Sequence, residues 1–320
     1  MRTALLFLFT LLLTAASPAA EVYPSRPVRV IVAFAPGGGT DFTARLISAQ
    51  LSEQTGKPFI VENRTGASGT IGYGLAAKSP PDGYTLLMMD LSMVIVPNLF
   101  KSLPFDVARD YTPITQIVGA PNVLLLSPTV TATTLKEFIA LAQANPGKLN
   151  YGSAGAGSAI HLTSELFNKA AKVSVTHVPY KGGGEAMTAL LGSHVDVVLT
   201  TVPSSLASVN SGKLRALAVT TSGKRSPAMP DVPSMSEAGV YGMTVYSWYG
   251  FGGPAGLPKE IVARVHAETV KALAVPSLKE RYLVQGSEPV GSGPEAFSKL
   301  VRDELRRWAE VVRTAGITPE

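Results

Sequence analysis

The sequence contains no cysteine among its 320 residues, and this absence excludes several classes of protein. A disulfide-stabilised scaffold, an iron–sulfur protein, a cysteine-ligated zinc site and thiol catalysis all require cysteine. Histidine is scarce as well, because the chain has only four, which is few for a histidine-rich metal cluster. We therefore expect no metal site and no cofactor.

Charge is also sparse, since only 16% of the residues are charged and the formal net charge is +5. A nucleic-acid-binding surface concentrates many more basic residues than this, so we expect no nucleic-acid partner. The mild positive charge is compatible with a small anion as ligand. The 30 glycines and 24 prolines are too many for a helical bundle and, lacking a period, do not indicate collagen.

Long hydrophobic runs are confined to the N-terminus. Arg2 precedes an apolar stretch over residues 4–16, and the small residues of 17–21 (SPAAE) follow, with cleavage expected near Ala19 or Ala20. This pattern predicts a secretory signal peptide over residues 1–20, because the apolar part is too short to span a bilayer. The alternative is an uncleaved membrane anchor. No later segment has 18 consecutive uncharged apolar residues, so we expect a soluble protein in a bacterial periplasm.

The first third of the exported chain alternates strand and helix patterns. Apolar residues predict strands over 27–34, 59–61 and 84–89. A helical pattern begins at Asp41, and a short helix is expected over 69–78. Strands and helices that alternate with short turns between them predict a parallel sheet covered on both faces.

The same alternation restarts at residue 122. A capping-box pattern over 134–137 (TLKE) predicts the start of a helix that ends near Asn145. The strands expected in this series cover residues 122–126, 149–152, 174–178, 195–200 and 214–220. The helices expected between them cover residues 159–171, 184–192 and 203–210.

The C-terminal third has one expected strand over 245–251 and three helices over 258–273, 276–285 and 293–315. These helices have no sheet of their own, so we expect them to return to the first series. The predicted fold class is therefore α/β, with two lobes closing on a hinged ligand cleft. Lobe 1 would comprise residues 21–122 and 228–320, and lobe 2 residues 123–227.

Three loops between predicted strands and helices are rich in glycine or small hydroxyl residues, at 36–41 (PGGGTD), 153–158 (SAGAGS) and 180–184 (YKGGG). Without a Cβ, backbone N–H groups can converge on a ligand oxygen, and the following helix contributes unpaired N–H groups and its dipole. Such helix starts bind phosphate or carboxylate. The alternative for each loop is an ordinary tight turn between strand and helix. Three such loops in two lobes favour an anion site in the cleft.

Patterns typical of enzymes are incomplete. The glycine loops complete neither a P-loop, nor a dinucleotide-binding fingerprint, nor the nucleophile turn of hydrolases. Ser158 and His161 are close enough along a helix to form a catalytic pair, with Glu185 or Asp196 as the acid. The alternative is a histidine at a helix start that hydrogen-bonds its own loop.

At these loops the chain resembles the Bug family, the substrate-binding proteins of tripartite tricarboxylate transporters. The segments that carry the resemblance are 34–41 (FAPGGGTD), 150–162 (NYGSAGAGSAIHL), 177–186 (HVPYKGGGEA) and 246–258 (YSWYGFGGPAGLP). The resemblance implies a type II periplasmic-binding-protein fold that closes on a small organic carboxylate and is not an enzyme. It also implies that the loops 37–41 and 153–158 hold the carboxylate through backbone N–H groups, hydroxyls and water.

Two positions depart from the family pattern. Asp90 stands where neutral small or amide residues are common, and Thr200–Thr201 stand where an acid or asparagine is common. If Asp90 faces the cleft, it disfavours a second ligand carboxylate and favours an amine; the alternative is a surface acid. The candidate ligand-binding residues are Phe34, Pro36, Gly37, Gly38, Gly39, Thr40, Asp41, Ser68, Asp90, Ser153, Ala154, Gly155, Gly157, Ser158, His161, Tyr180, Lys181 and Thr201.

The partners implied by the resemblance are the small carboxylate and the large and small membrane subunits of the transporter. We expect the protein to be a monomer. Two alternatives remain open at this point. One is a ligand-loaded partner of a periplasmic sensor domain, and the other is the exported Ser/His hydrolase.

Overall fold

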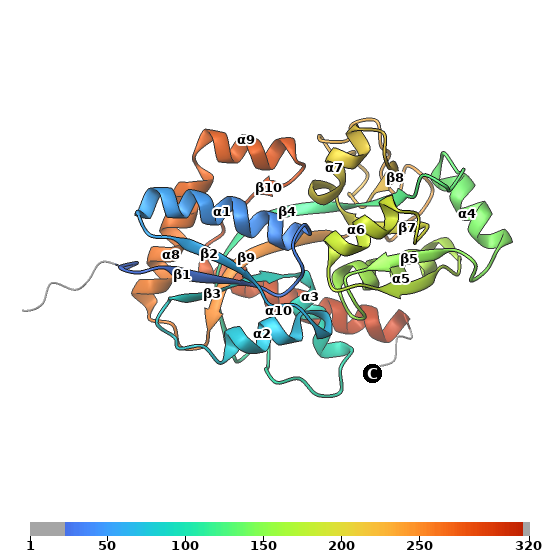
Figure 1. Cartoon of the computed structure of the whole chain (residues 1–320). Helices are drawn as coiled ribbons and strands as arrows, with labels where there is room; N and C mark the ends of the chain where they lie inside the picture. The colour runs from blue at the N-terminus through green and yellow to red at the C-terminus, as the bar shows by residue number, and fades with distance from the viewer. Residues whose placement is uncertain (1–22, 316–320) are drawn as a thin grey trace, which may run out of the picture.

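The structure is a computed structural model, and it describes residues 23–315. Two α/β lobes lie side by side (Figure 1) and share one long strand, β4 (Tyr111–Leu126). Its first part, through Pro121, pairs antiparallel with β9 (Tyr246–Pro254) in lobe 1. From Asn122 onward it pairs antiparallel with β7 (Val197–Thr201) and, from Val123, with β8 (Arg215–Val219) in lobe 2. The chain thus crosses between the lobes within a single strand.

The sheet of lobe 1 forms as the apolar patterns predict. The strands β1 (Val28–Val32), β2 (Phe59–Asn63) and β3 (Thr85–Asp90) are parallel, with β1 in the middle. β9 then pairs antiparallel with β3 and joins this sheet to β4. A two-residue strand, β10 (Glu288–Pro289), pairs with β4. Because β1 and β3 are parallel, their carboxyl ends lie at the same edge of the sheet.

Helices cover both faces of this sheet, and the late helices return to it as predicted. One core contains residues of α1 (Gly39–Thr55), α8 (Lys259–Leu273) and α9 (Pro276–Val284). The other contains residues of α2 (Thr70–Ala77), α3 (Leu91–Ile95) and α10 (Pro294–Ala315). Short 3₁₀ turns, η1 (Ala67–Gly69) and η2 (Val96–Asn98), flank α2 and α3.

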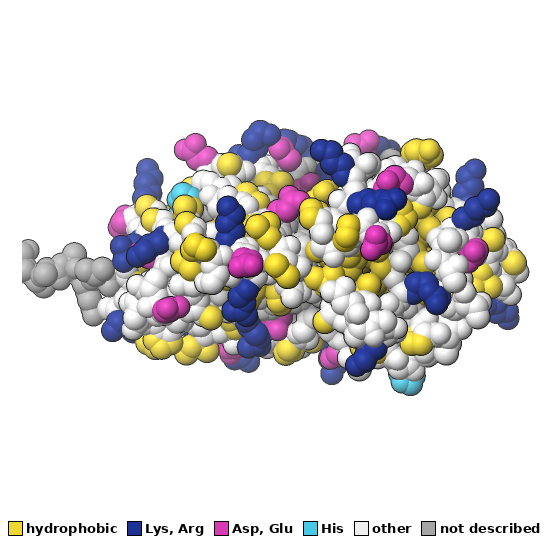
Figure 2. Space-filling model, turned by 90° about the horizontal axis from the view of Figure 1, so that it is seen from above, with side chains coloured by type: hydrophobic (Ala, Val, Ile, Leu, Met, Phe, Trp, Pro, Cys, Tyr) yellow, Lys and Arg dark blue, Asp and Glu magenta, His cyan; other side chains and the backbone are white. Residues whose placement is uncertain are grey.

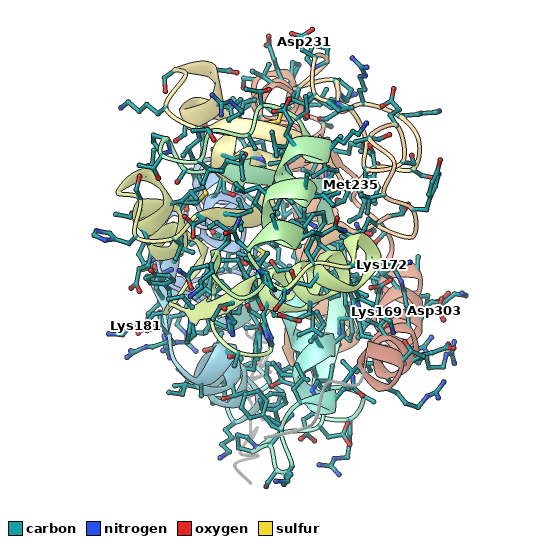
Figure 3. All side chains as sticks on the ribbon, turned by 90° about the vertical axis from the view of Figure 1, so that its right-hand side faces the viewer. Lys169, Lys172, Lys181, Asp231, Met235 and Asp303 are labelled. Carbon is teal, nitrogen blue, oxygen red and sulfur yellow. The ribbon has the colours of Figure 1, made fainter. Side chains whose placement is uncertain are left out.

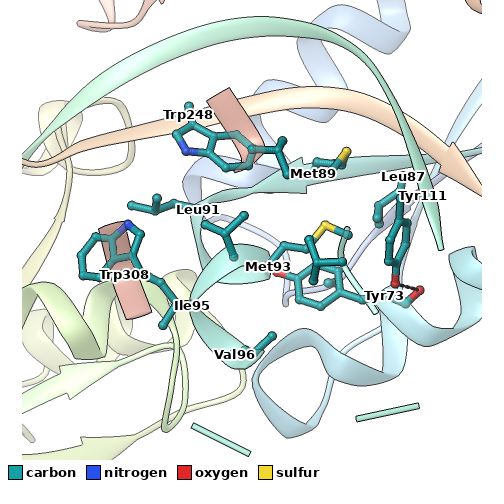
Figure 4. Close-up of a cluster of buried hydrophobic side chains, with 14 of the residues drawn as sticks. Tyr73, Leu87, Met89, Leu91, Met93, Ile95, Val96, Tyr111, Trp248 and Trp308 are labelled. Atoms are coloured by element: carbon teal, nitrogen blue, oxygen red, sulfur yellow. Dashed lines mark hydrogen bonds between the residues drawn. The ribbon is translucent and has the colours of Figure 1, made fainter. Parts of the chain in front are cut away.

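The second of these cores is rich in aromatic side chains (Figure 4). Trp308 of α10 and Tyr73 of α2 are fully buried, and Tyr111 donates a hydrogen bond to the Tyr73 carbonyl oxygen at 2.8 Å. Burial of such large apolar groups supplies the main stabilisation of the helices against the sheet.

Lobe 2 repeats the arrangement with a smaller sheet. The strands β5 (Asn150–Ser153) and β6 (Thr176–Pro179) are parallel to each other, and β5 is parallel to β7. The helices that cover this sheet are α4 (Leu135–Ala144), α5 (Ala159–Ala171), α6 (Gly183–Leu191) and α7 (Val202–Asn210). The predicted cap of α4 forms, because the Thr134 hydroxyl accepts a hydrogen bond from the Glu137 N–H.

The chain between β8 and β9 packs on lobe 2. Met229 lies in one of the cores of lobe 2, and Met235, Val240 and Met243 lie in the other. The packing of lobe 2 therefore extends beyond residue 227, where the sequence suggested a return to lobe 1. Helix α10 also reaches lobe 2, because Lys169 of α5 donates a hydrogen bond to the Thr314 carbonyl oxygen (Figure 3).

Basic and acidic side chains are interspersed over the face seen from above (Figure 2), without a continuous basic surface on that face. Within residues 23–315, none of the helices combines the length and apolar character that a membrane span requires. The same described part of the chain holds no group of three or more acidic or histidine side chains able to bind a metal ion.

Candidate functional site

A cavity of about 50 Å³ lies between the lobes. Its walls come from the carboxyl ends of β1, β3, β5 and β7, from the loop after β6, and from the strands β4 and β9 that join the lobes. Ligands bind at this end of parallel sheets because the loops and helix starts gather there. The lining residues are Phe34, Gly38, Gly39, Thr40, Asp90, Leu91, Ser92, Asn122, Ala154, Ser158, Ala159, Ile160, Gly183, Thr200, Thr201, Ser247 and Tyr249.

Four helices of at least two turns begin at this cavity. The first residues of α1, α5 and α6, which are Gly39, Ala159 and Gly183, line it, and so does Thr201, the N-cap of α7. The N-caps of α1, α6 and α7 make no side-chain capping bond. Unpaired N–H groups and four helix dipoles therefore favour negative charge in the cavity. No lysine or arginine is among the lining residues.

Asp41 supports the first glycine loop from outside the cavity. Its Oδ2 accepts hydrogen bonds from the Gly37 N–H at 3.1 Å and from Arg45 Nε at 3.0 Å. Its Oδ1 accepts from Asn63 Nδ2 at 2.9 Å. Burial raises the pKa of Asp41, but the hydrogen bonds from Arg45, Asn63 and Gly37 outweigh it and hold the pKa below its usual value. Asp41 thus fixes the shape of the loop.

A stack of aromatic rings supports the second loop, residues 153–158. The rings of Tyr151 and His177 are 4.9 Å apart and those of His177 and His161 are 4.2 Å apart. His161 Nδ1 accepts a hydrogen bond from the Gly157 N–H at 2.9 Å, and His177 Nε2 lies 2.5 Å from Ser153 Oγ. Burial lowers the pKa of both histidines to about 4, so both rings are neutral at pH 7.

These contacts do not form the hydrolase pair considered from the sequence. Ser158 Oγ accepts from the backbone N–H of His161 at 3.3 Å, as an N-cap does, and the histidine ring bonds its own loop. The two acids are engaged elsewhere, because Glu185 accepts from the Lys181 N–H and Asp196 from the Asn150 N–H. His161 has the loop-bonding role named as its alternative, and Ser158 caps the same helix.

The third glycine loop brings the lobes together. A Cβ at Gly184 would overlap the Pro36 carbonyl oxygen, and one at Gly182 would lie 2.8 Å from the Ala35 nitrogen. Glycine is therefore required at both positions for the backbones to approach this closely. Of this loop only Gly183 lines the cavity; Tyr180 is half-buried, and Lys181 is exposed at the edge of the molecule (Figure 3).

Asp90 points into the molecule and lines the cavity, with 2% of its surface exposed, so it is not the surface acid given as the alternative. Its Oδ1 accepts hydrogen bonds from the Tyr73 hydroxyl and the Ser92 N–H, both at 2.9 Å. Its Oδ2 accepts from Thr40 Oγ1 at 3.4 Å. Burial raises the pKa of Asp90 to about 6, although these hydrogen bonds lower it in part.

The structure brings fewer than half of the candidate residues into the cavity wall. Those that line it are Phe34, Gly38, Gly39, Thr40, Asp90, Ala154, Ser158 and Thr201. Those that lie outside the wall are Pro36, Gly37, Asp41, Ser68, Ser153, Gly155, Gly157, His161, Tyr180 and Lys181. Several of these shape the loops, and Ser68 instead bonds across the cleft to the Ala156 carbonyl oxygen.

Some lining residues were not among the candidates. Ser247 and Tyr249 lie on β9 and Asn122 lies at the crossing point of β4, far in sequence from any glycine loop. Ser92 was missed although Asp90, which ends the apolar run of β3, caps α3 by accepting a hydrogen bond from the Ser92 N–H. With only five residues, α3 is too short to show a helical period in the sequence. The others missed are Leu91, Ala159, Ile160, Gly183 and Thr200. Signals were available for six of the missed residues. The fragment SAIHL contains Ala159 and Ile160, the pair Thr200–Thr201 contains Thr200, the loop 180–184 contains Gly183, and the segment 246–258 contains Ser247 and Tyr249.

Two α/β lobes joined by shared strands, with helix starts around a cavity between them, define a type II periplasmic binding protein. Comparison with known proteins narrows this class. The profile of the TctC family, described as "Tripartite tricarboxylate transporter family receptor", matches residues 43–317. Protein BugT of Bordetella pertussis is 36% identical over 304 residues, which cover 94% of this chain and 93% of BugT.

Solved structures agree with this assignment. The periplasmic binding protein BugD is 34% identical, with a TM-score of 0.90, covering 93% of this chain and 100% of BugD. An R. palustris protein solved with adipate is 36% identical, also with a TM-score of 0.90, and the match covers 93% of this chain and 100% of that protein. This chain therefore belongs to the tripartite tricarboxylate transporter receptor family, as the resemblance to Bug proteins implied.

Proposed function

We propose that this receptor captures a small organic carboxylate between its lobes and delivers it to the membrane subunits of a tripartite tricarboxylate transporter. The observation that carries the proposal is the convergence of four helix starts on a cavity without lysine or arginine in its wall. Unpaired backbone N–H groups and the hydroxyls of Thr40, Ser158 and Thr200 suit carboxylate oxygens. The adipate bound to the R. palustris relative supports this class of ligand.

Ligand entry requires the lobes to separate. The cavity is narrow and lined by residues of both lobes, and the lobes contact each other around it. One of these contacts is the hydrogen bond from the Ala159 N–H to Ser92 Oγ at 3.0 Å. We place the hinge where β4 passes from β9 to β7, between Pro121 and Asn122, and where the chain enters β9 after Val245.

The remaining parts of the proposal concern the context of the protein. A signal peptide over residues 1–20, which lies outside the described residues, would export the chain to the periplasm. There the monomer would meet the large and small membrane subunits of the transporter. No step of this role requires catalysis. Docking of the loaded receptor on a periplasmic sensor domain is the alternative outcome of the same binding event.

Ligand-dependent stabilisation tests the proposal. The mature chain is heated with a panel of carboxylates, adipate and malate included, and with the corresponding amides as controls. A carboxylate present at a hundred times its Kd should add about 2.7 kcal/mol to the free energy of unfolding. The amides should add nothing, because they carry no charge to meet the helix dipoles. Equal stabilisation by acids and amides, or turnover of an ester panel, would contradict the proposal.

A further inference from the structure

Asp90 is the only charged residue in the wall of the cavity. Its two oxygen atoms have different surroundings. Oδ1 already accepts two hydrogen bonds of 2.9 Å, whereas the hydrogen bond from Thr40 Oγ1 to Oδ2 is long, at 3.4 Å. A carboxylate oxygen accepts up to two hydrogen bonds comfortably. Oδ2 therefore has capacity to accept a further hydrogen bond from a donor on the ligand.

No cation of the protein neutralises this carboxylate. Among the ion pairs of residues 23–315, none involves Asp90. The titratable groups packed near it are Tyr73 from α2 and Tyr249 from β9, and burial raises the pKa of both, so neither is charged. A buried ion without a counter-ion is costly, and a ligand that supplies the opposite charge recovers that cost on binding.

The site that favours negative charge is close to Asp90. Thr40 belongs to the first turn of α1, where the unpaired N–H groups are, and it also bonds Asp90. A ligand carboxylate at the start of α1 would therefore place the remainder of a short molecule beside Oδ2. At that place a second carboxylate would be repelled, a methyl group would leave Oδ2 unpaired, and an ammonium group would form a charge-assisted hydrogen bond.

We infer that Asp90 determines specificity, so that the receptor selects a short carboxylate bearing a protonated amine and rejects a dicarboxylate of the same length. The inference rests on the proposed function, because it assumes that a carboxylate occupies the helix starts. The expected ligand differs from that of the R. palustris relative, which was solved with adipate, a molecule with a carboxylate at each end.

Three compounds of equal chain length test the inference. 3-Aminopropanoate, butanoate and succinate share one carboxylate and differ in a terminal ammonium, methyl or carboxylate group. Titration calorimetry at about pH 7.5 should rank their affinities in that order, with at least about tenfold between the first two. The series one carbon shorter (glycine, propanoate, malonate) and one carbon longer (4-aminobutanoate, pentanoate, glutarate) guards against a wrong spacer length.

The Asp90→Asn variant should reverse the order of the end members. It keeps an oxygen for Tyr73 and Ser92 but removes the charge, so 3-aminopropanoate should lose at least about tenfold and succinate should gain. Butanoate should change by less than about threefold, which shows that the site is intact. Asp82→Asn is the control, because it removes an exposed acid of lobe 1 that pairs with Arg26. It should leave the order unchanged.

The pH dependence gives a second measurement on the wild-type protein alone. As the pH falls from about 8 to about 5.5, Asp90 takes up a proton, so 3-aminopropanoate should lose its advantage over butanoate. Equal binding of ammonium and methyl compounds, or tighter binding of the dicarboxylates, would overturn the inference while leaving carboxylate capture intact. If none of the nine acids nor any acid of the first panel binds, it is the proposed function that fails.

Discussion

Two glycine loops of similar composition face each other across the cleft. They are the loop 36–40 (PGGGT) of lobe 1 and the loop 180–184 (YKGGG) of lobe 2, and each leads into a helix. In each, an acidic side chain accepts a hydrogen bond from the backbone N–H four residues before it. In lobe 1 that acid, Asp41, is buried and also bonds Arg45 and Asn63. In lobe 2 the acid is Glu185, and it is exposed.

Glycine has a different role in each loop. Gly39 leaves room at the start of α1 for the Tyr249 hydroxyl and for Thr201 Oγ1, both in the cavity wall. Gly184 instead leaves room for the backbone of the other lobe, at the Pro36 carbonyl oxygen. Gly39 thus shapes the cavity wall, whereas Gly184 permits a contact between the lobes. What decides the role is the group that faces the missing Cβ, and a sequence does not record it.

The largest effect is expected from Gly39→Ala. The new Cβ would overlap the Tyr249 hydroxyl oxygen and lie 2.8 Å from Thr201 Oγ1, so it intrudes on the cavity wall. Carboxylate affinity should fall by at least about a hundredfold, or about 2.7 kcal/mol. Gly293→Ala is the control, because a Cβ there meets open space and Gly293 lies outside the cavity wall. Titration calorimetry on both variants checks this, and equal losses would contradict it.

Gly184→Ala should have the next largest effect, and it should act on closure. Its Cβ would overlap the Pro36 carbonyl oxygen, a backbone atom that moves only if the lobes separate. We expect about a tenfold to a hundredfold loss of affinity, because the closed form becomes less populated. X-ray scattering should show a radius of gyration that no longer shrinks on ligand addition. Gly293→Ala, with open space around its Cβ, is the control. A variant that closes normally would refute this role.

The acids that support the two loops should differ in their contribution to stability. Asp41→Asn removes a buried negative charge that accepts hydrogen bonds from three groups, the Gly37 N–H, Arg45 and Asn63. It should lower the free energy of unfolding by about 1–3 kcal/mol. Glu185→Gln at the exposed counterpart should change it by less than about 0.5 kcal/mol. The pKa of Asp41 lies below its usual 3.8, so its stabilisation is present at neutral pH and is lost as the pH falls below about 4.

Denaturant unfolding at about pH 7 and pH 3 measures both changes. The difference in stability between wild type and Asp41→Asn should shrink at the lower pH, because below the ordinary pKa of 3.8 the unfolded chain binds a proton more readily than the folded protein, in which the pKa of Asp41 is lowered. If Glu185→Gln destabilises the protein as much as Asp41→Asn, the two loops are supported alike and the contrast between them is wrong.

Much of the fold was predictable from the sequence, because apolar runs and helical periodicity mark elements that bury a continuous face. The helix predicted at residues 159–171 is α5 to the residue, and the late helices cover lobe 1 as expected. The first part of β4 was not predicted, because Pro113, Gly119 and Pro121 interrupt its apolar pattern. The strand tolerates such residues near the two shifts in its register with β9, one at Pro113 and one before Val118, and at Pro121, where it passes to the other lobe.

The site was predictable only where a local pattern faces the ligand region. Loops 36–40 and 153–158 are recognisable by their composition, so Gly38, Gly39, Thr40 and Ser158 were among the candidates, and all four line the cavity. Ser247 and Tyr249 were not among the candidates, although they lie in segment 246–258, which carries the family resemblance. The pairing with β3 and β4 brings β9 to the cavity, and the segment's local pattern does not show that pairing. Side chains behind the loops were among the candidates as well, and one of them, His161, lies outside the cavity wall and bonds the loop itself.

The smallest effect is expected from Lys181→Ala. Lys181 is the only basic residue in the three glycine loops, but its side chain is exposed and lies outside the cavity wall. Its backbone N–H donates a hydrogen bond to the Glu185 carboxylate at 3.1 Å. If backbone dipoles meet the ligand charge, removing this lysine should weaken carboxylate binding by less than about twofold. The dependence of affinity on salt should also be the same as in the wild type, since an exposed charge acts mainly through screened, long-range attraction. Titration calorimetry at about 0.02 M and 0.5 M salt, with the strongest carboxylate of the panel, measures both quantities. A tenfold loss confined to low salt would show that Lys181 steers the ligand electrostatically, and a loss at both salt concentrations would show that a direct ion pair, not the helix starts, holds the carboxylate.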